Sequence, residues 1–140
     1  MKDPIGALVT EMRQANIAGK RVRGKEPAPQ SSDYEGDALG PGSYKRFVVL
    51  SRLGIRRPFP RVPLQDARIG IRAYGVTAED AANLAGEISD FLNIRGARIV
   101  GSVQIHQTVD DGDWAAGTDP DTKQPYESGV ITVMAATAAA

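Results

Sequence analysis

The chain has 140 residues, no cysteine and a formal net charge of zero. This length suits one domain with its own core, and the lack of cysteine excludes disulfides, thiolate nucleophiles and cysteine metal ligands. The balanced charge gives the whole protein no attraction to nucleic acid or anionic membranes, and without a membrane-spanning apolar run or a signal peptide we expect a soluble protein that stays where it is made.

The first part of the chain predicts a helix followed by a long loop. Asp3 can cap a helix over residues 3–16, Pro4 suits its first position, and apolar residues follow at helical spacing. Residues 25–43 are rich in Pro, Gly and Ser with little apolar content. We expect them to form a flexible loop within a single domain that covers residues 1–140.

Two strands with a projecting connection are predicted next. Residues 44–53 form a strand with a continuous apolar centre. Three prolines then favour an extended loop over residues 54–63. Residues 66–74 alternate, with Ile69, Ile71 and Ala73 on one face, which indicates a half-buried strand.

The second half predicts a helix and two more strands. Thr77 and Asp80 form a variant capping box, and an apolar stripe follows it: Ala81, Leu84, Ala85, Ile88, Phe91 and Leu92. Residues 97–108 and 127–136 are the last strands. The order α-β-β-α-β-β predicts an α+β domain, with helices packed on a mostly antiparallel four-stranded sheet and long loops between strands.

Opposite charges are concentrated in two of the predicted connections. Residues 51–61 contain no acid and four arginines: Arg52, Arg56, Arg57 and Arg61. Residues 110–121 contain no base and five acids: Asp110, Asp111, Asp113, Asp119 and Asp121. We expect both stretches to extend outward from the sheet as arms.

Catalytic chemistry finds little support in the sequence. His106, the single histidine, is predicted to point to solvent, and the motifs of serine hydrolases, zinc proteases and phosphate-binding loops are absent. We expect no enzyme activity, no catalytic residue and no cofactor.

The acidic stretch has several readings. Its carboxylates are too crowded, and Glu127 comes too late, for the usual spacing of a calcium loop, so we expect no metal site. Paired catalytic carboxylates need a cleft, which a loop of this composition does not indicate. A solvated acidic loop and a contact surface remain. Trp114 argues against a fully solvated loop, because a large apolar side chain must be covered. It can fold back on its own sheet, or it can anchor a subunit interface.

The arginines also have two readings. They can bind phosphate backbones, or they can pair with carboxylates of a neighbouring copy. Contact between two different loops of identical chains is head to tail, and such contacts generate rings.

The chain resembles the tail terminator (tail completion) proteins of long-tailed, siphovirus-type phages. The resemblance rests on "DPIGALVTEMR", on "FVVLSRLG" before a proline-bearing loop, on "ARIGIRAYGVTAEDAANLAGEISDFLN" and on the final "DPDTKQPYESGVITVMA". The third stretch matches best: a strand ending in Arg72, Tyr74 and Gly75, then a helix that includes Thr77 and Ala81. Residues 25–43 depart from the pattern.

The resemblance implies a hexameric ring without enzyme activity that caps the completed tail tube and joins it to the head connector. Its partners would be other copies, the tail tube protein and a connector or head-closure protein, with DNA passing through the lumen. The location would be the neck of the virion, after synthesis in the host cytoplasm. Alternatives are another neck ring protein, a nucleic-acid-binding α+β module and, least favoured, a small metal-dependent hydrolase. The expected subunit interface consists of Arg52, Arg56, Arg57, Arg61, Asp110, Asp111, Asp113, Trp114, Asp119 and Asp121.

Overall fold

A computed structural model describes residues 4–20, 22–24, 46–56, 64–93, 96–101, 103–112, 114–120 and 123–137. Its elements are α1 (Pro4–Gln14), the short 3-10 helix η1 (Ile17–Lys20), β1 (Val22–Arg23), β2 (Phe47–Arg56), β3 (Leu64–Tyr74), α2 (Ala78–Asn93), β4 (Arg98–Val100), β5 (Val103–Asp110), β6 (Ala115–Thr118) and β7 (Pro125–Thr137). The loop predicted at residues 25–43 lies outside the described residues.

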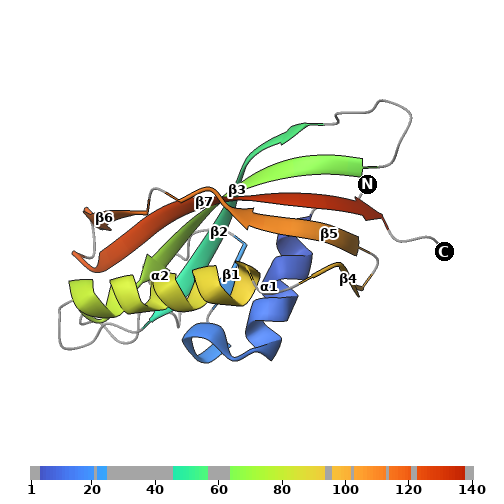
Figure 1. The fold of residues 1–140 in the computed structure, drawn as a ribbon. Helices are drawn as coiled ribbons and strands as arrows, with labels where there is room; N and C mark the ends of the chain where they lie inside the picture. The colour runs from blue at the N-terminus through green and yellow to red at the C-terminus, as the bar shows by residue number, and fades with distance from the viewer. Residues whose placement is uncertain are drawn as a thin grey trace.

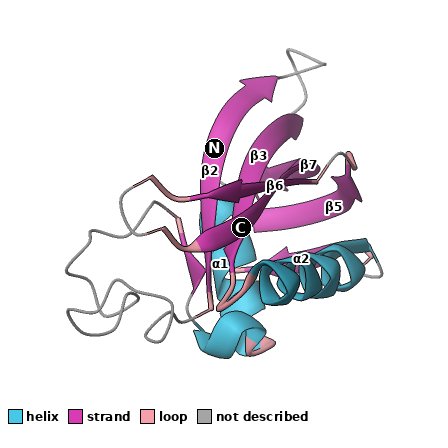
Figure 2. Cartoon of the chain, turned by 90° about the vertical axis from the view of Figure 1, so that its left-hand side faces the viewer, coloured by secondary structure: helices cyan, strands magenta, loops and turns pink. Residues whose placement is uncertain are grey.

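A single sheet organises the described elements. Six strands follow in the spatial order β1-β2-β3-β7-β5-β4, and the seventh, β6, pairs with β7. All pairs are antiparallel except β1 with β2. Helices α1 and α2 lie on the same side of the sheet (Figures 1 and 2). The α+β class with a mostly antiparallel sheet is therefore confirmed, whereas the prediction of four strands in the order α-β-β-α-β-β was too simple.

The core lies between this helix-covered face and the two helices. On α2 the side chains of Leu84, Ile88 and Leu92 are fully buried, as the apolar stripe predicted. On β3 the alternation also holds, because Ile69 and Ile71 are fully buried in the same cluster. Helical and strand periodicity thus identified the two surfaces that meet.

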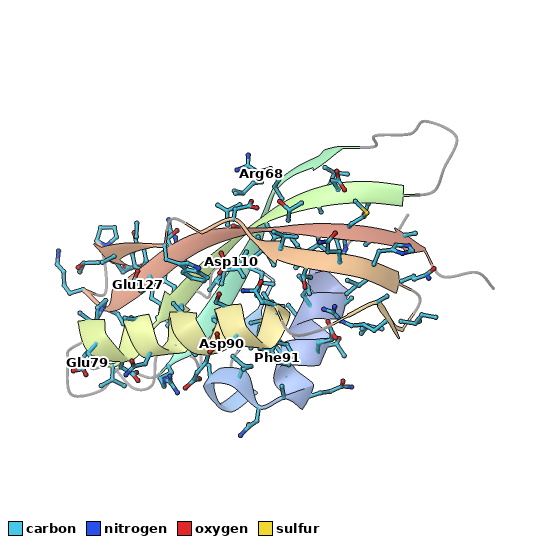
Figure 3. The ribbon with its side chains drawn as sticks, in the orientation of Figure 1. Arg68, Glu79, Asp90, Phe91, Asp110 and Glu127 are labelled. Carbon is cyan, nitrogen blue, oxygen red and sulfur yellow. The ribbon has the colours of Figure 1, made fainter. Side chains whose placement is uncertain are left out.

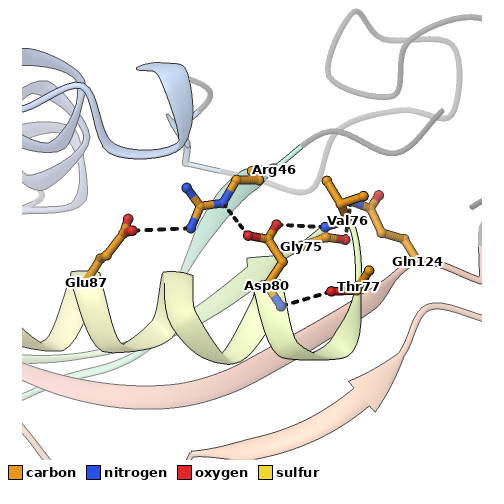
Figure 4. A network of polar contacts seen from close by, with 7 residues as sticks. All are labelled: Arg46, Gly75, Val76, Thr77, Asp80, Glu87 and Gln124. Atoms are coloured by element: carbon orange, nitrogen blue, oxygen red, sulfur yellow. Dashed lines mark hydrogen bonds and ion pairs between the residues drawn. The ribbon is translucent and has the colours of Figure 1, made fainter. Parts of the chain in front are cut away.

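The junction between β3 and α2 is held by a polar network (Figure 4). The backbone N–H of Asp80 donates to Thr77 Oγ1 over 3.1 Å, and the Asp80 carboxylate accepts from the backbone N–H of Val76 over 2.9 Å. This is the predicted capping box, with its return bond shifted by one residue. Arg46 then joins the start of β2 to α2, through Asp80 at 3.2 Å and Glu87 at 3.4 Å.

Two of the predicted strands differ most from the structure. The strand expected at 97–108 is a hairpin of β4 and β5, because Gly101 takes a left-handed φ of 61° and reverses the chain. Strand β2 continues to Arg56, although a loop was predicted from residue 54. Its outer half pairs with β3, so the backbone bonds of that strand hold it extended.

The acidic connection is partly built into the sheet, which corrects the expected outward loop. Strand β5 pairs with β7 up to Asp110 opposite Ile131, and β6 resumes the same edge with Ala115 opposite Ser128. The chain advances five residues from Asp110 to Ala115 while β7 advances only three, from Ser128 to Ile131. The two extra residues form a bulge that projects from the sheet edge. Beyond β6, a turn closes with the backbone N–H of Lys123 donating to the Asp119 carbonyl over 2.9 Å.

The sheet face away from the helices carries a row of aromatic side chains at one end. The rings of Phe47 and Tyr74 stack with centroids 4.2 Å apart, and the Tyr126 ring lies 5.3 Å from Tyr74. The guanidinium of Arg72 lies 4.9 Å from the Tyr126 ring centre. Tyr74 lies on the face opposite Ile69 and Ile71, and it is nevertheless fully buried.

Candidate functional site

Asp110 is the hub of the bulge between β5 and β6. Its carboxylate accepts hydrogen bonds from Ser89 Oγ on α2, from Trp114 Nε1 at 3.0 Å and from the backbone N–H of Gly112 at 2.8 Å. Burial raises the pKa of this carboxyl, but these hydrogen bonds to the ionised form outweigh it and hold the pKa below its usual value. Asp110 therefore ties the bulge to α2 within its own chain.

Trp114 packs on the same chain, which was one of the two readings of this residue. Its indole is half-buried against the core cluster. The ring lies directly on Gly129 of β7, where an added Cβ would come within 2.5 Å of the indole. The absence of a side chain at Gly129 thus leaves the space in which the Trp114 indole packs. Part of the ring still reaches the surface, beside α2.

The other predicted acids are scattered by the fold. The exposed Asp111 lies near the sheet face away from the helices, which we call the open face. Its carboxylate accepts a hydrogen bond there from Thr132 Oγ1 over 3.1 Å. Asp119 is buried at the turn after β6. Asp113 and Asp121 lie outside the described residues. The carboxylates that have described side chains therefore do not form one acidic surface.

The predicted arginines belong to the hairpin of β2 and β3. Arg52 is exposed on β2, and the backbone of Arg56 ends that strand opposite Asp66. The Arg56 side chain, Arg57 and Arg61 lie outside what the structure describes. The outer half of the hairpin extends beyond the two helices (Figure 1). It exposes Leu53 by 55% and Ile55 by 41%, which are large values for apolar side chains on a strand.

Three further acids were not singled out by the sequence. The side chains of Glu79 and Asp90 on α2, and of Glu127 on β7, make no hydrogen bond or ion pair within the described residues. Figure 3 shows that they lie on the helix side of the molecule, whereas Arg68 of β3 points away from the opposite face. Helix α2 has four acids and no base, and this imbalance was the available signal in the sequence.

The hydrogen bonds to Asp110 predict a pH-dependent stability. A carboxyl with a lowered pKa in the folded state stabilises the fold above its unfolded pKa, and this contribution is lost as the pH falls through the folded value. Asp110→Asn should therefore lower the free energy of unfolding by about 1 kcal/mol at pH 7, after discounting for solvent screening at a half-buried site. Urea unfolding should show the difference between parent and variant shrinking below about pH 3.8, the ordinary value for this group. Glu79→Gln is the exposed control and should cost much less at pH 7; a constant difference at all pH values would contradict the role of the Asp110 charge.

Comparisons with known proteins add no identification. A scan against protein-family models finds no match, and a search of curated proteins finds none either. Among the described residues, no three His, Asp or Glu side chains are grouped so that they could hold a metal ion. Neither α-helix in the described ranges is long and apolar enough to cross a membrane.

Proposed function

We propose that this protein is a structural subunit of a phage neck or tail that assembles head to tail into a hexameric ring. Within that class, the tail terminator is the best fit: a ring that caps the completed tail tube and joins it to the head connector. The protein acts by assembly, without catalysis. Its partners are other copies of itself, the tail tube protein and a connector protein.

The observation that carries this proposal is the projecting hairpin of β2 and β3. Leu53 and Ile55 are exposed on it, and within the described residues β1 covers the outer edge of β2 only at Val48 and Val49. A long strand edge with exposed apolar side chains favours pairing or packing with another chain. A stable monomer would be expected to shield such a hairpin.

The resemblance to tail terminators gives independent support. Its best-matching stretch spans the junction of β3 and α2, where Gly75 is buried and Thr77 caps the helix. That stretch therefore corresponds to a strand-to-helix junction at which particular residue types are required. The departure at residues 25–43 lies outside the described part of the structure.

The proposal predicts concentration-dependent rings. Light scattering and negative-stain images of the purified full chain should show closed rings as concentration rises. Arg56→Glu together with Arg57→Glu should lower the ring fraction, most strongly at low salt. The new glutamates would repel acidic side chains of the neighbouring copy at every contact. A control that reverses Lys123, at the far end of the sheet, should assemble like the parent.

Two outcomes separate this proposal from its alternatives. A parent protein that stays monomeric at all concentrations, and that binds DNA in a salt-sensitive way, would support a nucleic-acid-binding module instead. Rings that also bind purified tail tubes lacking their terminator would distinguish a tail terminator from another neck ring protein.

A further inference from the structure

A hollow on the helix side of the molecule has one acid, Glu127, in its lining, and two further acids of α2 lie on the helix flank next to it. It has a volume of about 340 Å³ and lies where α2 meets β6 and β7, lined by Ala82, Ala85, Gly86, Ser89, Trp114 and Glu127. We call it the acidic hollow. Small side chains and the indole supply the apolar part of its lining, while Ser89 and Glu127 are its polar residues.

Two acids of α2 share a helix flank with Gly86, which lies at the rim of this hollow. Asp80 and Glu87 are held by Arg46 on one flank of the helix. Glu79 and Asp90 are eleven positions apart in α2, which is about three turns, so they share another flank with Gly86 between them. That flank faces solvent with two charges that the described residues do not neutralise.

The hairpin offers a surface of complementary chemistry on the other side of the sheet. Leu53 packs near Gly70 on the open face, since an added Cβ on Gly70 would lie 3.5 Å from it. Arg68 is paired opposite Gly54 and is exposed. We define the hairpin patch as Leu53 and Arg68, which share this face, whereas Ile55 is paired opposite the buried Ala67 and lies on the other face. An apolar side chain beside a positive charge is what a partly apolar hollow with adjacent acids would bind.

We propose that the hairpin patch of one copy docks in the acidic hollow of the next copy. This inference rests on the proposed ring, because it names the surfaces that join its subunits. The two surfaces lie on opposite sides of one chain, so the contact is head to tail and repeats around a ring. Burial of Leu53 and Trp114 contributes the affinity, and the charges fix orientation. Asp110 contributes indirectly, since its hydrogen bond holds Trp114 at the hollow.

Gly86 gives a test that leaves the fold intact. A Cβ added there meets no atom within 4 Å, so a larger side chain is accommodated in the isolated subunit. Gly86→Phe should fill the hollow and raise the concentration at half-assembly by about tenfold, as expected for loss of a central contact. Gly86→Ala is the matched control and should assemble like the parent. Thermal melting at a concentration below assembly should show both variants folded.

A charge exchange tests the pairing itself. Arg68→Glu and Glu127→Arg should each weaken assembly, and the double variant should recover most of the loss. Asp111→Lys, on the open face, should have a smaller effect than Glu127→Arg. If folded Gly86→Phe and Glu127→Arg assemble like a ring-forming parent, the docking surface is wrong while the ring proposal stands. If the parent itself never assembles, both are wrong.

Discussion

Replacing Gly75 with alanine is expected to destabilise the protein by about 3–5 kcal/mol. A Cβ at this position would lie 2.2 Å from the backbone nitrogen of Ala81 and 2.6 Å from its Cα. Backbone atoms of a helix cannot give way locally, so the first turn of α2 would have to move off β3. The move would also strain two hydrogen bonds of the Gly75 backbone. The Gly75 N–H donates to the Pro125 carbonyl, and Gln124 Nε2 donates to the Gly75 carbonyl.

Urea unfolding of purified monomer measures this effect, and Gly86→Ala supplies a control with the same chemical change. Gly86 lies in the middle of α2 with open space around it, so alanine there should stabilise the helix by about 0.5–1 kcal/mol. The two substitutions should thus have opposite signs. Equal unfolding midpoints for Gly75→Ala and the parent would show that the contact between β3 and α2 is looser than described.

Truncating Ile88 should cost about 2–5 kcal/mol, the usual range for a large aliphatic residue in a core. Ile88 is fully buried between α2 and the sheet, so alanine would leave a cavity that the surrounding strands cannot close. The melting temperature should fall by several degrees in calorimetry or circular dichroism. Asn83→Ala, on the exposed side of the same helix, should change it little. An unchanged melting temperature for Ile88→Ala would contradict the packing of α2.

The elements that sequence predicted well are those with a long, uniform periodicity. The stripe of α2 runs for four turns, and both of its ends have chemical signals in Thr77 and in the loss of the apolar pattern after Leu92. The alternation of β3 was equally clear. These patterns arise because one face of each element is buried against the other, so the pattern and the packing have the same physical origin.

Strands without such a pattern were missed. Strand β6 reads Ala-Ala-Gly-Thr, which has little strand propensity, and it forms because β7 offers an unpaired edge beside it. The glycine of that strand is needed, since a Cβ on Gly117 would come within 2.6 Å of the Tyr126 ring. The turn at Gly101 was hidden in an alternating run that continues on both sides of it. Pairing with β7 decided the structure of β6, whereas the left-handed turn at Gly101 decided that of β4 and β5.

The candidate interface shows the same limit. Charge counting found that acids and bases are segregated, but it could not tell which carboxylates the fold uses internally. Asp110 lies in a polar stretch typical of a surface loop, yet its carboxylate is hydrogen-bonded within its own chain. Glu127 lies inside a strand, yet its carboxylate pairs with no described side chain. The grouping of the predicted interface acids into one acidic arm is wrong for the described members, because the bulge and the turn separate them.

The seat of Trp114 has an optical consequence. The chain has one tryptophan, so its fluorescence on selective excitation reports a single place in the molecule. The indole rests on Gly129, hydrogen-bonds to Asp110 and presents its remaining surface to the hollow beside α2. Removal of water from that surface shifts indole emission to shorter wavelengths. The native chain therefore carries its own spectroscopic label at the proposed contact, so association there can be followed in real time without attaching a dye.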